Sequence, residues 1–127
     1  MLVGQTQFMR ETFAHQAILS MQPDGDLRVP GAAITEELCG HWEHEPPCPV
    51  APHHTTADRV GDAVHLRTLF ATEPEREGEV RVIIDRALSM GQLDHPTGAG
   101  TRWRLRSSQS SPVTAEERDH AERLSNT

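Results

Sequence analysis

The chain has 127 residues and a mass of 14.1 kDa, a length typical of one domain. Its 12 arginines, with no lysine, stand against 19 aspartates and glutamates, and the net charge of −7 disfavours binding to nucleic acid or to an anionic membrane surface. No apolar run reaches the roughly 18 residues that span a bilayer, and residues 1–5 lack the basic and apolar regions of a signal peptide, so we expect a cytoplasmic protein without membrane insertion.

The first forty residues predict strands joined by a tight turn. We assign residues 1–12 to a loose N-terminal arm and residues 13–21 to a strand. Gln-Pro-Asp-Gly-Asp at 22–26 has the composition of a hairpin turn, because proline presets φ and glycine accepts a positive φ. A short returning strand over 27–29 follows from that turn. Apolar residues then fall at even positions over 34–43, which predicts a further strand.

The middle of the chain changes character twice. Four prolines between positions 46 and 52 predict a stiff, proline-rich loop over 45–54, because proline removes backbone donors and favours extended geometry. A turn at 60–63 then leads into alternating apolar residues over 64–70, which indicate a strand.

A helix is predicted next, over about 73–90. Thr72-Glu73-Pro74-Glu75 has the pattern of a capping box with proline in the first turn. Apolar side chains then recur at helical spacing as far as Gly91, a residue suited to the left-handed cap that ends a helix.

The last third of the chain becomes polar. Alternating arginine and apolar residues over 101–106 predict an edge strand, and the serine-rich stretch at 107–111 predicts a linker. Thr114 and Glu117 form a second capping-box pattern at the start of a short polar helix, which we expect to stay outside the core unless it docks.

These elements predict an α+β fold: a small, mostly antiparallel sheet with one main helix, about 73–90, packed on one face. The domain plan is an N-terminal arm at 1–12, a single α+β domain at 13–106, and a Ser-rich linker with a polar C-terminal tail at 107–127.

The clearest chemical signal is a cluster of cysteine and histidine. Both cysteines and four of the eight histidines lie within residues 39–54. Thiolate and imidazole are the ligands that zinc prefers, although nickel, copper and iron also accept them. The sequence therefore predicts a metal site, with zinc first, and its candidate ligands are Cys39, His41, Cys48, His53, His54 and His44.

The favoured arrangement uses four of these ligands. In a strand, Cys39 and His41 point to one face, and the proline loop can bring Cys48 back over them together with either His53 or His54. The paired Cys-x-x-Cys spacing typical of zinc motifs is absent. The alternative is a proline-rich surface loop with solvated histidines, in which Cys39 is a small apolar filler of the core.

A catalytic interpretation is also open. His41-Trp42-Glu43 has the His-x-Glu form found in iron sites that use two histidines and one carboxylate. The third ligand would be His53, His65 or His95. A barrel enzyme of that kind has little use for a long helix at 73–90, so the sequence favours a non-enzymatic role.

Three functional hypotheses follow. The first is a metal-binding accessory or adaptor protein, in which the metal holds the 39–54 segment for a protein partner or a second copy of the chain. The second is a small metalloenzyme that uses His41 and Glu43. The third is a metal-free subunit of a larger assembly.

The remaining charged residues carry less information. Arg102, Arg104 and Arg106 share one strand face and suit an anionic partner, but we expect the acidic helix face with Glu75, Glu77 and Glu79 to neutralise them. For His15 and His120 we expect solvent exposure.

Overall fold

The computed structural model describes residues 10–39, 51–93 and 101–126. The elements in chain order are β1 (Glu11–Met21), α2 (Val29–Cys39), β2 (His53–Val60), β3 (Ala63–Thr72), the 3-10 turn η1 (Pro74–Arg76), α3 (Glu77–Ser89), β4 (Gln92–Leu93), β5 (Thr101–Ser111), the 3-10 turn η2 (Ala115–Glu117) and α4 (Arg118–Ser125).

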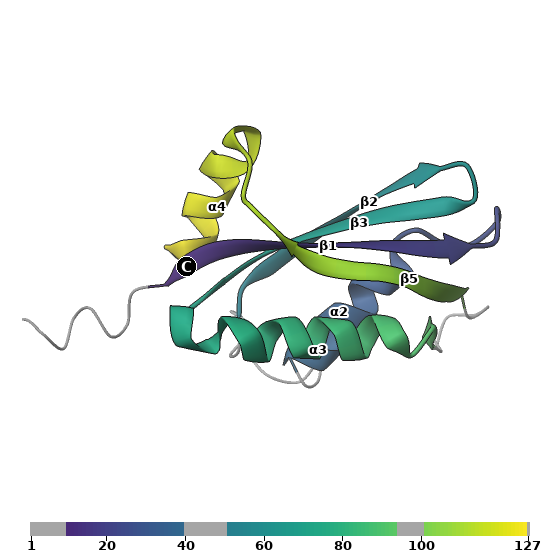
Figure 1. Ribbon diagram of the computed structural model, residues 1–127, viewed down its shortest axis with the longest axis horizontal. Coiled ribbons are helices and arrows are strands. Elements are labelled where there is room, and N and C mark those ends of the chain that lie inside the picture. Colours follow the sequence, from purple (N-terminus) through teal and green to yellow (C-terminus); the bar gives the residue numbers. More distant parts are fainter. Residues whose placement is uncertain (1–9, 40–50, 94–100, 127) are drawn as a thin grey trace, which may run out of the picture.

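The strands form one antiparallel layer in the order β2-β3-β1-β5-β4 (Figure 1). Strand β3 lies between β1 and β2, so the β1-α2-β2 unit is split by a strand that runs the other way. With α3 leading on to β5, this is the β-α-β-β-α-β arrangement called ferredoxin-like. The predicted α+β class with a mostly antiparallel sheet is confirmed. The fold by itself specifies no function.

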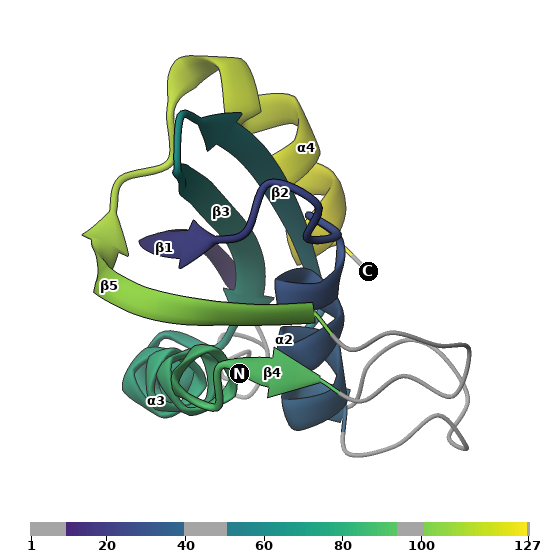
Figure 2. The same cartoon turned by 90° about the vertical axis from the view of Figure 1, so that its right-hand side faces the viewer.

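Helices cover the two faces of the sheet unequally. Both α2 and α3 pack on one face, and α4 lies on the other face near one end (Figure 2). The core lies under α2 and α3, where strand residues at every second position meet the apolar sides of the two helices. Its most buried side chains include Leu19, Ile34, Leu38, Val64, Phe70, Val80, Ile84 and Leu88.

The helix predicted over 73–90 is confirmed as η1 followed by α3. Its start differs in detail, because Glu73 is the cap residue and makes no side-chain cap bond, while the Thr72 hydroxyl is buried without a hydrogen-bond partner. Gly91 ends the helix with a φ of 72°. A Cβ on Gly91 would lie 2.9 Å from the carbonyl oxygen of Trp103, so the close approach of β5 also requires glycine here.

The strands predicted over 27–29 and 34–43 are wrong where the structure describes them, because residues 29–39 form α2. Apolar residues four positions apart, such as Ile34 and Leu38, satisfy the strand period of two and also fall on one side of a helix. Both side chains are buried. Pro30 stands in the first turn of the helix, where its missing N–H leaves no bond unmade.

The serine-rich linker predicted at 107–111 is also wrong. Strand β5 continues to Ser111 and pairs with β1 as far as Ala14. A register shift opposite Ile18 and Leu19 takes up one extra residue in β5. The strand persists because its partner supplies backbone hydrogen bonds whatever the side chains are.

The C-terminal tail docks on the sheet. The predicted capping box forms between Thr114 and Glu117, and Ala121 of α4 is buried. The Thr12 hydroxyl of β1 donates to the Ala121 carbonyl oxygen at 2.7 Å. In the described part of the chain, no helix is long and apolar enough to cross a membrane.

Candidate functional site

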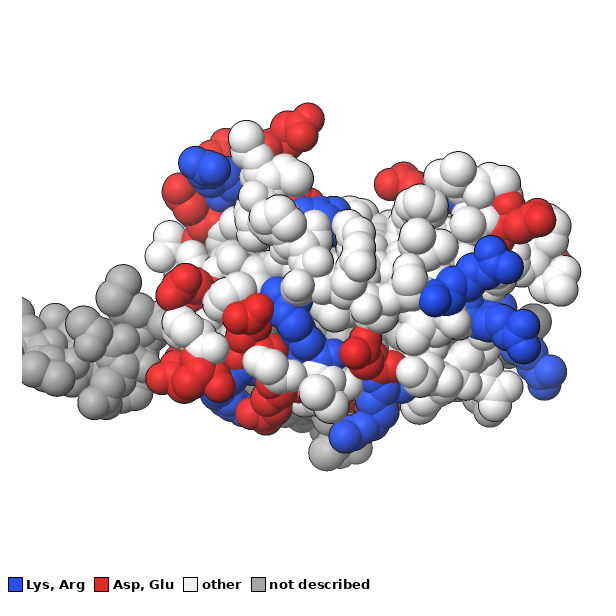
Figure 3. Space-filling model, viewed as in Figure 1, with Lys and Arg blue, Asp and Glu red and all other residues white. Residues whose placement is uncertain are grey.

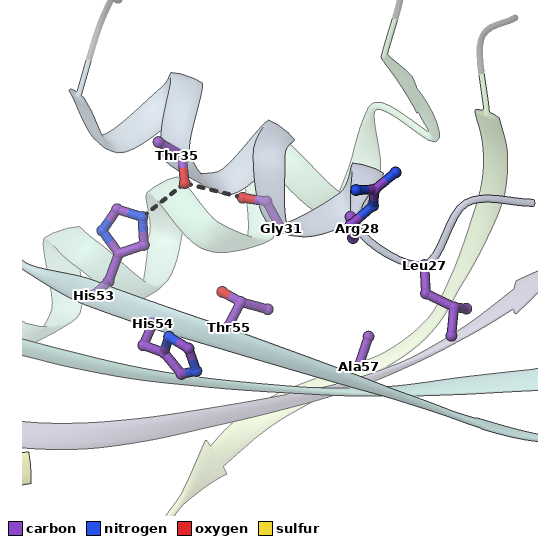
Figure 4. Close-up of a pocket in the computed structure, with 8 residues that line it drawn as sticks. All are labelled: Leu27, Arg28, Gly31, Thr35, His53, His54, Thr55 and Ala57. Carbon is purple, nitrogen blue, oxygen red and sulfur yellow. Dashed lines mark hydrogen bonds between the residues drawn. The ribbon is translucent and has the colours of Figure 1, made fainter. Parts of the chain in front are cut away.

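A cavity of about 360 Å³ lies between α2 and β2 (Figure 4). Its polar side chains come from both elements, and His53 faces Thr35 across the space between strand and helix. The lining residues are Leu27, Arg28, Gly31, Thr35, His53, His54, Thr55 and Ala57.

The spacing of residues on α2 sets how the helix meets the strand. Gly31 lies against Thr55, and a Cβ at position 31 would be 3.3 Å from the Thr55 Cβ. One turn further on, the Thr35 hydroxyl lies 2.9 Å from Nε2 of His53. Another turn brings the chain to Cys39, the last residue of α2. Residues four apart lie on the same side of a helix. Residue 39 is therefore on the same side of α2 as residues 31 and 35, the side that faces β2.

The hydrogen bonds of His53 fix its tautomer. Nδ1 lies 3.0 Å from the carbonyl oxygen of Ala51, and since a carbonyl can only accept, Nδ1 carries the proton. Nε2 then accepts from the hydroxyl of Thr35. Burial lowers the pKa of His53, which favours the neutral ring.

This is the state in which histidine binds a metal. A ligating imidazole uses one neutral nitrogen and donates the other N–H to a carbonyl or carboxylate, which orients the ring. Thr35 also has a second acceptor, because its hydroxyl lies 3.2 Å from the carbonyl oxygen of Gly31. An ion at Nε2 can therefore displace Thr35 without leaving that hydroxyl unpaired.

The two adjacent histidines of β2 point to opposite faces of the sheet. While His53 turns toward α2, His54 packs against His120 of α4 with ring centroids 4.6 Å apart and the rings tilted by 56°. The sequence left open which of the two joins the site; both line the cavity, but only the ring of His53 is hydrogen-bonded to α2 among the described residues.

The other predicted ligands are placed only in part. Cys39 ends a helix, so the strand face that it was predicted to share with His41 does not exist at position 39. His41, His44 and Cys48 lie outside the described residues. Within residues 10–39, 51–93 and 101–126, no group of three His, Cys, Asp or Glu side chains is placed to hold a metal ion.

The alternative iron site with His41 and Glu43 needs a further histidine, and the described residues place none of its other candidates beside His53. His65 is exposed and alternates with the buried Val64 and Leu66, so it lies on the sheet face opposite α2 and His53. His41, Glu43 and His95 fall outside the described segments.

His120, predicted to be exposed, is half-buried against His54, and His15, also predicted to be exposed, is buried in β1. Only 4% of it is exposed. The signal was present, because His15 alternates with the buried Ala17 and Leu19 on β1. Arg81 of α3 donates to Nδ1 of His15 at 2.9 Å.

The direction of the hydrogen bonds around His15 shows that this histidine does not activate Ser108 as a nucleophile. An arginine only donates, so Nδ1 of His15 accepts and the proton sits on Nε2. Nε2 donates to Ser108 Oγ at 2.6 Å, and Ser108 donates to Asp85. Since His15 gives a proton to the Ser108 oxygen, it cannot act as the base that activates it.

The buried His15 predicts a pH-dependent stability. Its pKa lies below 6.5, mainly because of burial, with Asp85 opposing and Arg81 adding to the shift. The unfolded chain therefore takes up the proton first, and the free energy of unfolding should fall as pH drops below 6.5. The slope from this group is at most about 1.4 kcal/mol per pH unit.

Urea unfolding between pH 7.5 and 5.5 measures this slope. His15→Gln should give a flatter profile than the parent, whatever its absolute stability. Val60→Ala, at an exposed position without a titratable group, is the control and should keep the parent slope. Equal slopes in the parent and His15→Gln would contradict the assignment.

Neither a protein-family model nor a curated protein matches this sequence.

Proposed function

We propose that the protein is a small cytoplasmic metal-binding accessory or adaptor protein that binds one transition-metal ion, zinc first, through residues 39–54. The ion holds this segment in one conformation for contact with a protein partner or a second copy of the chain. The observation that supports this most is the neutral His53, whose Nδ1 is tied to a carbonyl and whose Nε2 faces α2, the helix that ends at Cys39.

The covalent connection adds to this support. Cys39 ends α2 and His53 begins β2, so both ends of the cysteine- and histidine-rich segment are anchored on neighbouring elements of the same sheet face. His41, His44 and Cys48 lie between them in sequence. The ligands are drawn from Cys39, His41, Cys48, His44 and His53, and His54 is left out because it faces α4.

Elemental analysis of protein purified without added metal tests the proposal. We expect close to one ion per chain and a lower melting temperature after a chelator, because a ligand that binds only the folded state stabilises it. Cys39→Ala with Cys48→Ala should abolish the metal content. Metal-free protein whose melting temperature does not respond to chelator would contradict the proposal and favour a metal-free subunit of a larger assembly.

The two adjacent histidines provide a matched pair of variants. His53→Ala should weaken zinc affinity by 10-fold or more, an order of magnitude typical for groups that hold a metal site, and His54→Ala should leave it unchanged. Competition with a coloured zinc chelator gives both values. Equal losses in the two variants would contradict the assignment of His53.

A further inference from the structure

A second surface lies at the beginning of β5. A groove of about 550 Å³ is lined there by Arg102, Arg104 and Arg106, together with residues from the end of β1 and the following turn, such as Ser20 and Gln22. Figure 3 shows basic side chains gathered over this end of the molecule, apart from the acidic side chains around α3.

The acidic helix does not neutralise these arginines, contrary to the expectation from sequence. Glu77 pairs with Arg81 at 2.8 Å, and Glu79 pairs with Arg76 at 3.2 Å. In the part of the chain that the structure describes, none of the three groove arginines forms an ion pair. Asp62 is the one carboxylate among the described residues that line the groove.

The same strand has an open edge. β5 pairs with β1 along one side, whereas on its other side β4 covers only Thr101 and Arg102. One further bond joins the Trp103 N–H to the Gly91 carbonyl oxygen at 2.9 Å. Residues 104–111 of β5 have no second strand beside them among the described residues.

The charges decide what can pair with this edge. A second copy of β5 would bring like charges together, which disfavours self-pairing. A phosphate backbone has no peptide N–H and C=O groups with which to pair along the open edge. A protein strand with carboxylates on alternate residues meets both conditions: it supplies main-chain partners, and its side chains on one face repeat at the same spacing as Arg104 and Arg106.

We propose that the open edge of β5 binds an extended acidic segment of a partner protein as an additional strand, with its carboxylates over Arg104 and Arg106. Main-chain hydrogen bonds to residues 104–111 hold the segment, and the arginines select its charge. The proposal does not depend on the metal site, so protein treated with a chelator can be used for its test as well as untreated protein.

A short labelled peptide of alternating glutamate and valine is the probe, titrated with the full-length protein and followed by fluorescence anisotropy. Arg104→Gln with Arg106→Gln should weaken binding by about tenfold, the loss of two cross-strand charge pairs. Arg86→Gln, which removes an exposed arginine from α3, makes half that charge change elsewhere and should leave binding unchanged.

Two further probes separate strand addition from simple charge attraction. A backbone N-methylated version of the peptide cannot donate main-chain hydrogen bonds and should not bind. A single-stranded oligonucleotide of equal charge should bind more weakly than the peptide. Unchanged affinity in the double variant, undiminished binding of the N-methylated peptide, or equal binding of the oligonucleotide would each overturn the proposal.

Discussion

Phe70→Ala should lower the free energy of unfolding by about 3–5 kcal/mol, the range for a large aromatic side chain removed from a packed core. Phe70 is fully buried in the second half of β3. Its ring lies 5.6 Å from that of Phe13, centroid to centroid, and the guanidinium of Arg81 lies 5.2 Å from its centroid. The change therefore leaves a cavity and also removes the aromatic face beneath a cation.

Urea denaturation of the parent and the variant, each analysed by linear extrapolation, measures this loss. Phe70→Leu, which fills most of the volume, should cost clearly less than the alanine variant. Val60→Ala is the control, because Val60 is 59% exposed at the end of β2 and should change stability by no more than about 0.5 kcal/mol. A loss below about 1 kcal/mol for Phe70→Ala would contradict the central packing role of the ring.

Arg67→Met should release the C-terminal helix and cost about 2–4 kcal/mol, because it breaks a network and leaves a half-buried carboxylate unpaired. The Arg67 guanidinium donates to both carboxylate oxygens of Glu117 at 2.5 and 2.9 Å. It also donates to the Ser111 hydroxyl at 2.8 Å and to the Pro112 carbonyl oxygen at 2.6 Å. This side chain ties β3 to the end of β5 and to the turn before α4.

Amide hydrogen exchange locates the effect. Protection should fall in α4 and its preceding turn while the core strands stay protected in Arg67→Met. The exposed Arg86→Met is the control and should leave α4 protected. Unchanged protection of α4 in Arg67→Met would contradict its role as the anchor.

The same contact explains how acid should act on the tail. Arg67, through its hydrogen bonds, lowers the pKa of Glu117 to about 2 from an ordinary value near 4.5. The folded-state pKa is the lower one, so the stabilisation is present above pH 4.5 and is lost as pH falls toward 2. Undocking of α4 in this range uncovers the buried Ala14 and Leu69 on that face of the sheet.

Local sequence patterns predicted the elements whose pattern fits only one type of secondary structure. The 73–90 helix shows apolar residues at helical spacing with Gly91 at its end, and no strand period fits them. The strand over 64–70 is confirmed as part of β3, and its apolar residues at every second position, such as Val64 and Leu66, are buried. Thr114 and Glu117 close their capping box within four residues, so sequence alone suffices there.

Where the sequence pattern fits more than one type of secondary structure, the tertiary contacts decided which one forms. Ile34 and Leu38 fit both periods, and the choice of a helix came from packing against α3 and β2. Residues 107–111 have no strand composition, and β1 made them a strand by pairing. Whether the groove arginines are neutralised depended on which partners the acidic side chains of α3 pair with, and the spacing of residues along the chain does not show this.

The candidate site divides in the same way. The sequence alone determined that six possible metal ligands gather within residues 39–54, because a cluster of residue types is a property of the chain itself. Only the tertiary structure decided that His53 faces α2 with a neutral, oriented ring and that His54 packs against α4 instead. The physical reason is the alternation of side chains along β2: adjacent residues point to opposite faces, and which helix covers each face follows from contacts between distant parts of the chain.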